Sequence, residues 1–265
     1  MKTTTPVFVV GSGRCGTRMI KKLLAGVEHI EARHEYVRNA YQRESAMYYM
    51  GKLSYELMAE KLLDIYVPAI YYSKADFFLD SSQHLCWCVD VLADIFPTAK
   101  FVHLVRDGRK VVSSFFHKLN IFDDYGAKVL RDWMEGREDV PPPLTENFWQ
   151  VLPPKHCDMF QRICWHWVRS NEDIMNSLDN LIPRDRKLFI RLEDLATSEK
   201  VMTDFLSFLN VPYNKSFMET MKRPEHVYVP VDFKLTEDQQ RQFHEIAQWM
   251  QLLLGYTEDE YNVNY

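Results

Sequence analysis

The segment VFVVGSGRCGTRMIKKLL, residues 7–24, decides the fold that the rest of the sequence completes. Its first four residues are apolar and mostly β-branched, which predicts a strand buried on both faces of a parallel sheet. Three glycines follow within six residues, and apolar residues then recur at helical spacing. A strand, a glycine-rich turn and a helix in this order build a phosphate cradle, because backbone N–H groups and the positive end of the helix dipole face an anion.

The sequence of this loop, GSGRCGT at residues 11–17, indicates which anion it binds. A Walker A loop places a lysine between its last glycine and a Ser or Thr that binds magnesium. Here Thr17 follows Gly16 directly, and the positive charge lies inside the loop at Arg14. A guanidinium binds two phosphate or sulfate oxygens at once without a metal. The alternative is a glycine-rich turn without a ligand, since one such loop is a weak signal. The predicted anion-binding residues are Gly13, Arg14, Cys15, Gly16, Thr17 and Arg18.

Length and composition predict a single globular domain over residues 1–265. The chain is 46% hydrophobic and 26% charged, as is ordinary for such domains. Its net charge of −5 argues against a nucleic-acid partner, so an anion site has to be a local basic pocket. The five cysteines are scattered without zinc-site spacing, and we expect no metal. Because there is neither a signal peptide nor an apolar run of about 18 residues, we expect a cytoplasmic protein without a membrane span.

Strand and helix patterns alternate along the chain and predict an α/β fold, a parallel central sheet with helices on both faces. Further strands are predicted within residues 27–36, at 100–105 and at 187–192, and a short apolar run at 77–79 leads into Asp80-Ser81-Ser82. Helices are predicted at 39–66, 89–96, 110–118, 157–178, 200–209 and 236–254. In such a sheet the ligand lies at the carboxyl ends of the strands.

Residues 119–160 interrupt this alternation. They are rich in acidic residues and contain Pro141-Pro142-Pro143 and Pro153-Pro154. Long loop regions of this kind are usually functional. We therefore expect an excursion from the sheet that shapes the mouth of the site.

A second anion site is predicted where the strand at 100–105 ends. Arg106 lies at the strand end, and Ser114 lies eight residues later in the following helix. A guanidinium from the strand and a hydroxyl from the helix can hold a phosphate from two sides. The alternative is a local ion pair between Arg106 and Asp107, with Ser114 as an ordinary helix residue.

The two segments together resemble the sulfotransferase family that uses 3′-phosphoadenosine-5′-phosphosulfate (PAPS). GSGRCGT is similar to its 5′-phosphosulfate loop, and FVHLVRDGRKVVSS at 101–114 is similar to its 3′-phosphate motif. FPTAKF at 96–101 and FIRLEDL at 189–195 are further similarities, and the segment from 223 to 256 resembles the family's tail without its glycine and tryptophan landmarks. The resemblance implies a three-layer fold like that of the P-loop NTPases.

The resemblance also implies an activity, the in-line transfer of a sulfuryl group from PAPS to a hydroxyl or amine, with 3′-phosphoadenosine-5′-phosphate (PAP) as product. Arg14, Thr17 and the loop backbone would hold the 5′-phosphosulfate. Arg106 and Ser114 would hold the 3′-phosphate, and Arg191 is a further candidate for binding the co-substrate. Like phosphoryl transfer, this reaction depends on positioning and on electrostatic stabilisation.

Transfer also needs a group that accepts the proton of the acceptor. Glu35 lies 21 residues after Arg14, the spacing that separates the loop arginine from the base in tyrosylprotein sulfotransferases. His34 is the substitute candidate, because imidazole titrates near neutrality. Many family members carry a lysine where this sequence reads Asp80-Ser81-Ser82, and Ser81 or Ser82 could donate a hydrogen bond in its place.

Two other functions stay open at this point. A nucleotide kinase or NTPase shares the loop topology, although the lysine before Thr17 is missing. A non-catalytic nucleotide-binding module would explain the missing lysine at 80–82. The acceptor of a sulfotransferase could be a small molecule, a carbohydrate or a peptide, and the sequence does not predict the oligomeric state.

Overall fold

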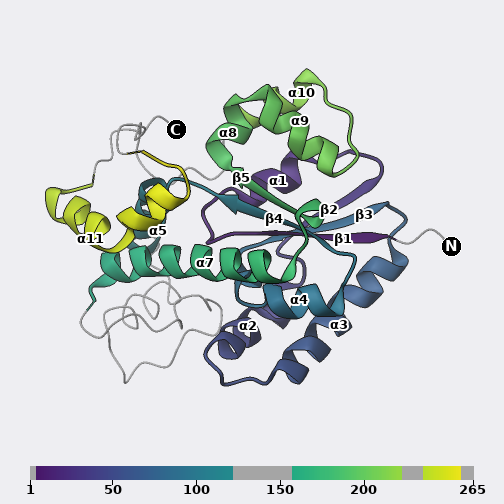
Figure 1. The fold of residues 1–265 in the computed structure, drawn as a ribbon, viewed down its shortest axis with the longest axis horizontal. Coiled ribbons are helices and arrows are strands. Elements are labelled where there is room, and N and C mark those ends of the chain that lie inside the picture. The colour runs from purple at the N-terminus through teal and green to yellow at the C-terminus, as the bar shows by residue number, and fades with distance from the viewer. Residues whose placement is uncertain (1–3, 122–156, 223–234, 258–265) are drawn as a thin grey trace.

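The computed structural model describes residues 4–121, 157–222 and 235–257 (Figure 1). Most of the expected excursion at 119–160 lies outside the described residues, and its role stays a prediction. No helix within the described ranges is long and apolar enough to cross a membrane.

A five-stranded parallel sheet forms the centre of the fold, as the strand and helix patterns predicted (Figure 1). Its strand order is β2-β3-β1-β4-β5, and each neighbouring pair is parallel. The strands are β1 Thr5–Val10, β2 Ile30–His34, β3 Phe77–Ser82, β4 Lys100–Val105 and β5 Lys187–Arg191. The glycine-rich loop therefore directly follows β1, the central strand.

Helices cover both faces of the sheet and complete three layers (Figure 1). Val7 and Val9 of β1 pack into one core, and Phe8 and Val10 pack into the other, as alternation along a strand requires. One face carries α1 Thr17–Leu23, α8 Leu192–Thr197, α9 Glu199–Phe208 and α10 Lys215–Met221. The other carries α3 Tyr55–Tyr72, α4 Val89–Ile95, α5 Gly108–Ile121 and α7 Met159–Leu181, with α11 Glu237–Leu253 along α7.

The single helical segment expected at 39–66 is in fact two helices, α2 Gln42–Tyr49 and α3. Gly51 has a φ of 67°, a left-handed conformation that ends a helix readily. Ser54 then caps α3 by accepting the Leu57 N–H at 3.4 Å. The helix α3 also continues beyond the predicted end at 66 and includes Pro68.

The helix α10 was not predicted. Asn214 starts it by accepting the Ser216 N–H at 2.9 Å. Phe217 and Met221, four residues apart, bury one face against the core. Two apolar positions in seven residues are too short a pattern to indicate a helix from sequence.

The carboxyl ends of four strands gather predicted site residues together with two residues that were not predicted, Gln83 and His84. The glycine-rich loop follows β1, Glu35 follows β2, Gln83 and His84 follow β3, and Arg106 follows β4. Parallel strands bring these positions to one edge of the sheet, where α/β proteins bind their ligands.

Candidate active site

The glycine-rich loop, residues 11–16, is held in a backbone conformation that few residues adopt. The φ angles of Gly13, Arg14 and Gly16 are 82°, 52° and 99°. The φ of Gly13 favours glycine, and a Cβ atom there would lie 1.9 Å from Oε1 of Gln83, the residue that follows β3. The loop is thus packed directly against the end of the neighbouring strand.

The two predicted anion sites are contiguous in the structure. Arg14 Nε donates a hydrogen bond to Ser114 Oγ at 2.9 Å, and Arg106 Nη1 donates to the Arg14 carbonyl at 3.1 Å. Ser114 is buried on α5, whereas both arginines are half-buried. Two adjacent guanidinium groups with partial burial favour an anion with several charges. The local ion pair of this motif joins Asp107 to Arg109 at 2.9 Å.

His166, on α7, holds the glycine-rich loop through a hydrogen bond to its backbone, and the sequence did not indicate this role. Its Nε2 lies 3.0 Å from the carbonyl oxygen of Ser12. Burial lowers the pKa of His166 to about 3, so the imidazole is neutral at physiological pH. Because a carbonyl only accepts, Nε2 carries the proton and donates it to Ser12. A histidine among the apolar positions of a long helix resembles an ordinary core residue, and only the packing of α7 against the loop reveals its partner.

Glu35 begins the turn after β2 and lies in a charged, mostly buried environment. Its side chain is 14% exposed and accepts a hydrogen bond from Arg38 Nη1 at 2.8 Å. Its own N–H donates to the Ser81 carbonyl at 3.2 Å, which ties the turn to β3. Burial raises the pKa of this carboxyl, but two neighbouring imidazoles and the Arg38 guanidinium outweigh burial and hold the pKa below its ordinary value. Glu35 is therefore ionised at neutral pH and able to accept a proton.

His84 is a second site residue that sequence reasoning missed. It is 1% exposed, and its Nε2 lies 3.6 Å from Glu35 Oε1, an ion-pair distance when the imidazole is protonated. It sits in a short 3₁₀ helix, Gln83–Trp87, directly after β3. The sequence feature that indicates this role is a histidine directly after β3, the strand that pairs with β1. It lies close to residues 80–82, where many family members carry a lysine.

The comparisons with known proteins concern the family and the fold of this chain. A model described as "Sulfotransferase family" matches residues 6–142, more than half of the 265 residues. The chain belongs to the sulfotransferase family. No curated protein sequence matches this sulfotransferase significantly.

Solved structures show the same fold at low sequence identity. A sulfotransferase from Alicyclobacillus acidocaldarius has a TM-score of 0.55 at 14% identity, covering 97% of this chain and 98% of that one. The sulfotransferase domain of the Synechococcus PCC 7002 olefin synthase has a TM-score of 0.53 at 16% identity, covering 94% and 96%. The sulfotransferase domain of the curacin biosynthetic pathway has a TM-score of 0.52 at 15% identity, covering 97% and 99%.

In this sulfotransferase, the side chains of Ser81 and Cys15 have structural partners. Ser81 is fully buried and its Oγ lies 2.7 Å from the Thr17 carbonyl and 3.1 Å from the Arg33 carbonyl, so its hydroxyl proton is directed to the backbone. Burial raises the pKa of the Cys15 thiol to about 11, and the side chain belongs to the core. These contacts favour a structural role for the Ser81 hydroxyl and for the Cys15 side chain, and co-substrate binding by the Cys15 backbone stays a prediction.

His34 lies at the end of β2, opposite Ser81 in the neighbouring strand. Burial lowers the pKa of its imidazole and, together with the nearby cations Arg18, Lys21 and Arg38, outweighs the opposite effect of Glu35. A neutral His34 is available as a base at physiological pH. Arg18 is exposed on the first turn of α1, and its charge acts on His34.

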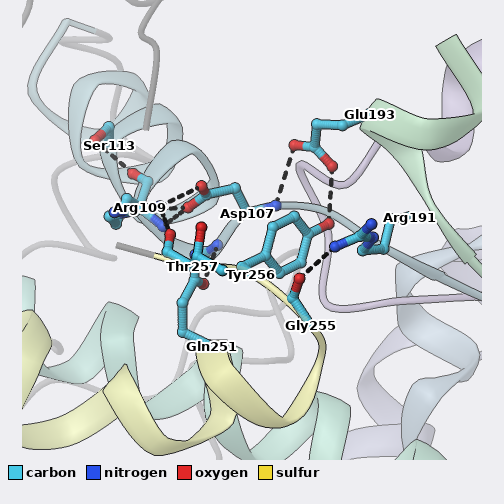
Figure 2. Close-up of polar contacts among 10 residues, drawn as sticks. Asp107, Arg109, Ser113, Arg191, Glu193, Gln251, Gly255, Tyr256 and Thr257 are labelled. Atoms are coloured by element: carbon cyan, nitrogen blue, oxygen red, sulfur yellow. Dashed lines mark hydrogen bonds and ion pairs between the residues drawn. The ribbon is translucent and has the colours of Figure 1, made fainter. Parts of the chain in front are cut away.

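Arg191, the further co-substrate candidate, is engaged by the protein at the end of β5 (Figure 2). Its Nε donates to Asp194 Oδ2 at 2.6 Å, and its Nη1 donates to the Gly255 carbonyl. The guanidinium also lies 5.3 Å from the ring centroid of Tyr256. These contacts give Arg191 a role in holding residues 255–257, and its role toward the co-substrate stays a prediction.

The same network continues to the second anion motif (Figure 2). Glu193 accepts the Tyr256 hydroxyl at 2.8 Å and the Asp107 N–H at 3.2 Å. Arg109 binds the Asp107 carboxylate and donates to the Thr257 carbonyl at 3.0 Å. The end of α11 is thus fastened to the carboxyl ends of β4 and β5, next to Arg106.

Proposed function

We propose that this sulfotransferase transfers the sulfuryl group of PAPS to a hydroxyl or amine of its acceptor and releases PAP. The observation that carries the proposal is the contact of Arg14, Ser114 and Arg106 at the carboxyl edge of the sheet, the edge at which the ionised Glu35 also lies. PAPS carries a phosphosulfate and a separate 3′-phosphate, and two contiguous basic sites suit that pair of anions.

The residues present fit this co-substrate. The loop backbone of residues 13–17 and the Arg14 guanidinium would bind the 5′-phosphosulfate. Arg106 and the buried hydroxyl of Ser114 would bind the 3′-phosphate. Arg14 is held between both sites by Ser114, so it is oriented before the ligand arrives, which reduces the cost of ordering it.

Glu35 would act as the base of the transfer. It accepts the proton from the acceptor's O–H or N–H, the acceptor atom forms a bond to sulfur, and the bond from sulfur to the phosphate oxygen breaks. Arg14 stabilises the charge that then develops on the leaving phosphate. His84, 3.6 Å away, favours the ionised carboxylate and is suited to share the proton afterwards. His34 is the alternative base.

Titration calorimetry tests the co-substrate. Adenosine 3′,5′-bisphosphate should bind more tightly than 5′-AMP and than ATP with magnesium. Arg106→Ala should weaken the bisphosphate by about 10- to 100-fold, the value of a hydrogen-bonded ion pair, and leave 5′-AMP unchanged. Arg241→Ala, on the exposed face of α11, is the matched control and should have no effect. Preference for ATP with magnesium would contradict the proposal and favour a kinase or NTPase.

A second measurement separates an enzyme from a non-catalytic nucleotide-binding module. The protein is incubated with ³⁵S-labelled PAPS and a panel of phenols, alcohols, amines, sugars and peptides. Transfer of the label to at least one class supports an enzyme and identifies the acceptor chemistry. Binding of the bisphosphate without transfer to any class would favour the module.

A further inference from the structure

A chain of buried polar side chains lies behind Glu35 and His84. Asp80, Ser82, Tyr41 and Tyr66 are each 0% exposed. The Tyr66 hydroxyl donates to Asp80 Oδ2 at 2.6 Å, and the Tyr41 hydroxyl lies 3.0 Å from Ser82 Oγ. The rings of Tyr66 and Tyr41 pack together with their centroids 6.4 Å apart, which brings the two pairs side by side. Asp80 and Ser82 lie on β3, Tyr66 lies on α3, and Tyr41 lies directly before α2.

Both ends of this chain hold the backbone of a site residue or of its neighbour. Asp80 Oδ1 accepts the N–H of Tyr36, the residue after Glu35, at 3.1 Å. Ser82 Oγ accepts the N–H of His84 at 3.2 Å. This buried network of two hydrogen-bonded pairs, packed through their tyrosine rings, therefore fastens the two sides of the Glu35–His84 contact.

The turn that carries Glu35 needs such support. Glu35 has a φ of 50° and Val37 a φ of 49°, and both are left-handed conformations that non-glycine residues adopt at a cost. The N–H of Tyr36, between them, is held by the Asp80 carboxylate, and a carboxylate is a stronger acceptor than a neutral group. Burying a charged group is costly, so a position with no role beyond packing gains little from an aspartate.

We propose that Asp80 is a positioning residue: through Tyr66, Tyr41 and Ser82 it holds Glu35 and His84 against each other. The hydrogen bonds of Asp80 and Ser82 define the geometry of the network, whatever reaction the protein catalyses. Its significance for catalysis rests on the proposed function, in which Glu35 accepts the acceptor's proton.

The test compares Tyr66→Phe with Tyr55→Phe. Both tyrosines lie on α3 and donate to an aspartate, but Tyr55 donates to exposed Asp94 outside the network. Tyr66→Phe should speed amide hydrogen exchange at Tyr36 and His84 at least tenfold over the control. The Glu35 carboxyl, followed by ¹³C NMR, should bind its proton about tenfold more tightly, because it moves away from His84 and Arg38. Exchange and proton affinity equal to those of Tyr55→Phe would overturn the proposal.

Asp80→Asn is the second variant if Tyr66→Phe does not fold. It keeps the shape of the side chain and removes the charge, and it should speed exchange at the same two amides. Loss of the Asp80 charge by itself weakens proton binding by Glu35, so amide exchange is the readout for this variant. With an acceptor from the transfer panel, either variant should lower kcat at least tenfold without changing bisphosphate affinity. The exchange and NMR measurements need no acceptor, so they remain decisive even if the protein binds no bisphosphate, the result that would instead reject the proposed function.

Discussion

The substitution Asp80→Asn should change how stability depends on pH. Burial raises the pKa of the folded Asp80 carboxyl from an ordinary 3.8 to about 6, despite hydrogen bonds from Tyr66 and the Tyr36 N–H that oppose it. The folded protein therefore binds this proton more tightly than the unfolded chain does. The contribution of Asp80 to stability is fully present below pH 3.8, declines as the pH rises to about 6, and is lost above that.

The size of this effect on the free energy of unfolding follows from the two pKa values of Asp80, in the unfolded chain and in the folded protein. A difference of about two pH units, at about 1.4 kcal/mol for each, corresponds to about 3 kcal/mol. Asparagine stays neutral throughout, and its altered hydrogen bonds shift stability by an amount that does not depend on pH. Part of this effect has already occurred at pH 4, because the unfolded carboxyl is half ionised at pH 3.8. Relative to the wild type, Asp80→Asn should therefore gain about 2 kcal/mol in free energy of unfolding between pH 4 and pH 7.

Urea unfolding of both proteins at pH 4, 5, 6 and 7 measures this difference directly. Asp94→Asn removes an exposed carboxylate that also accepts a tyrosine hydroxyl, and it serves as the control. A free-energy difference between wild type and Asp80→Asn that stays constant from pH 4 to 7 would refute the reasoning. The reasoning would also be refuted if the wild type became more stable relative to Asp80→Asn as the pH rises, because that result requires a lowered pKa for the folded Asp80 carboxyl.

Two further predictions concern the site. Glu35→Gln should lower turnover by about 10²- to 10⁴-fold, measured with ³⁵S-labelled PAPS and an acceptor from the panel, while bisphosphate affinity stays unchanged; near-normal turnover would exclude Glu35 as the base. His166→Phe leaves the Ser12 carbonyl without its donor, so it should destabilise the protein by about 1–3 kcal/mol in urea and weaken bisphosphate binding. His103→Phe is the control, because it removes another buried histidine, one that pairs with Asn171. It should destabilise the protein without weakening bisphosphate binding. If both variants weaken bisphosphate binding equally, His166 has no specific role in the loop.

The sequence by itself determined the central strand, the loop, the parallel sheet and the position of the candidate residues at its carboxyl edge. These features follow from local patterns, because a run of β-branched residues and the loop glycines constrain the backbone within a few residues. The sequence placed Arg14 and Ser114 in two separate anion sites, and their direct contact follows from the pairing of β1 with β4, the strands that precede the loop and α5. The boundary between α2 and α3 was missed because Gly51 and Ser54 are weak signals inside a helical pattern.

Only the tertiary structure decided how distant segments meet at the site. His166 reaches Ser12 across 154 residues, and His84 meets Glu35 because β2 and β3 are neighbours and the Glu35 turn is left-handed. The support from Asp80 passes through tyrosines of α2's start and α3, whose orientation depends on how those helices pack. Periodicity predicts which face of a helix is buried, but not which polar group that face meets, because the partner is set by packing between elements.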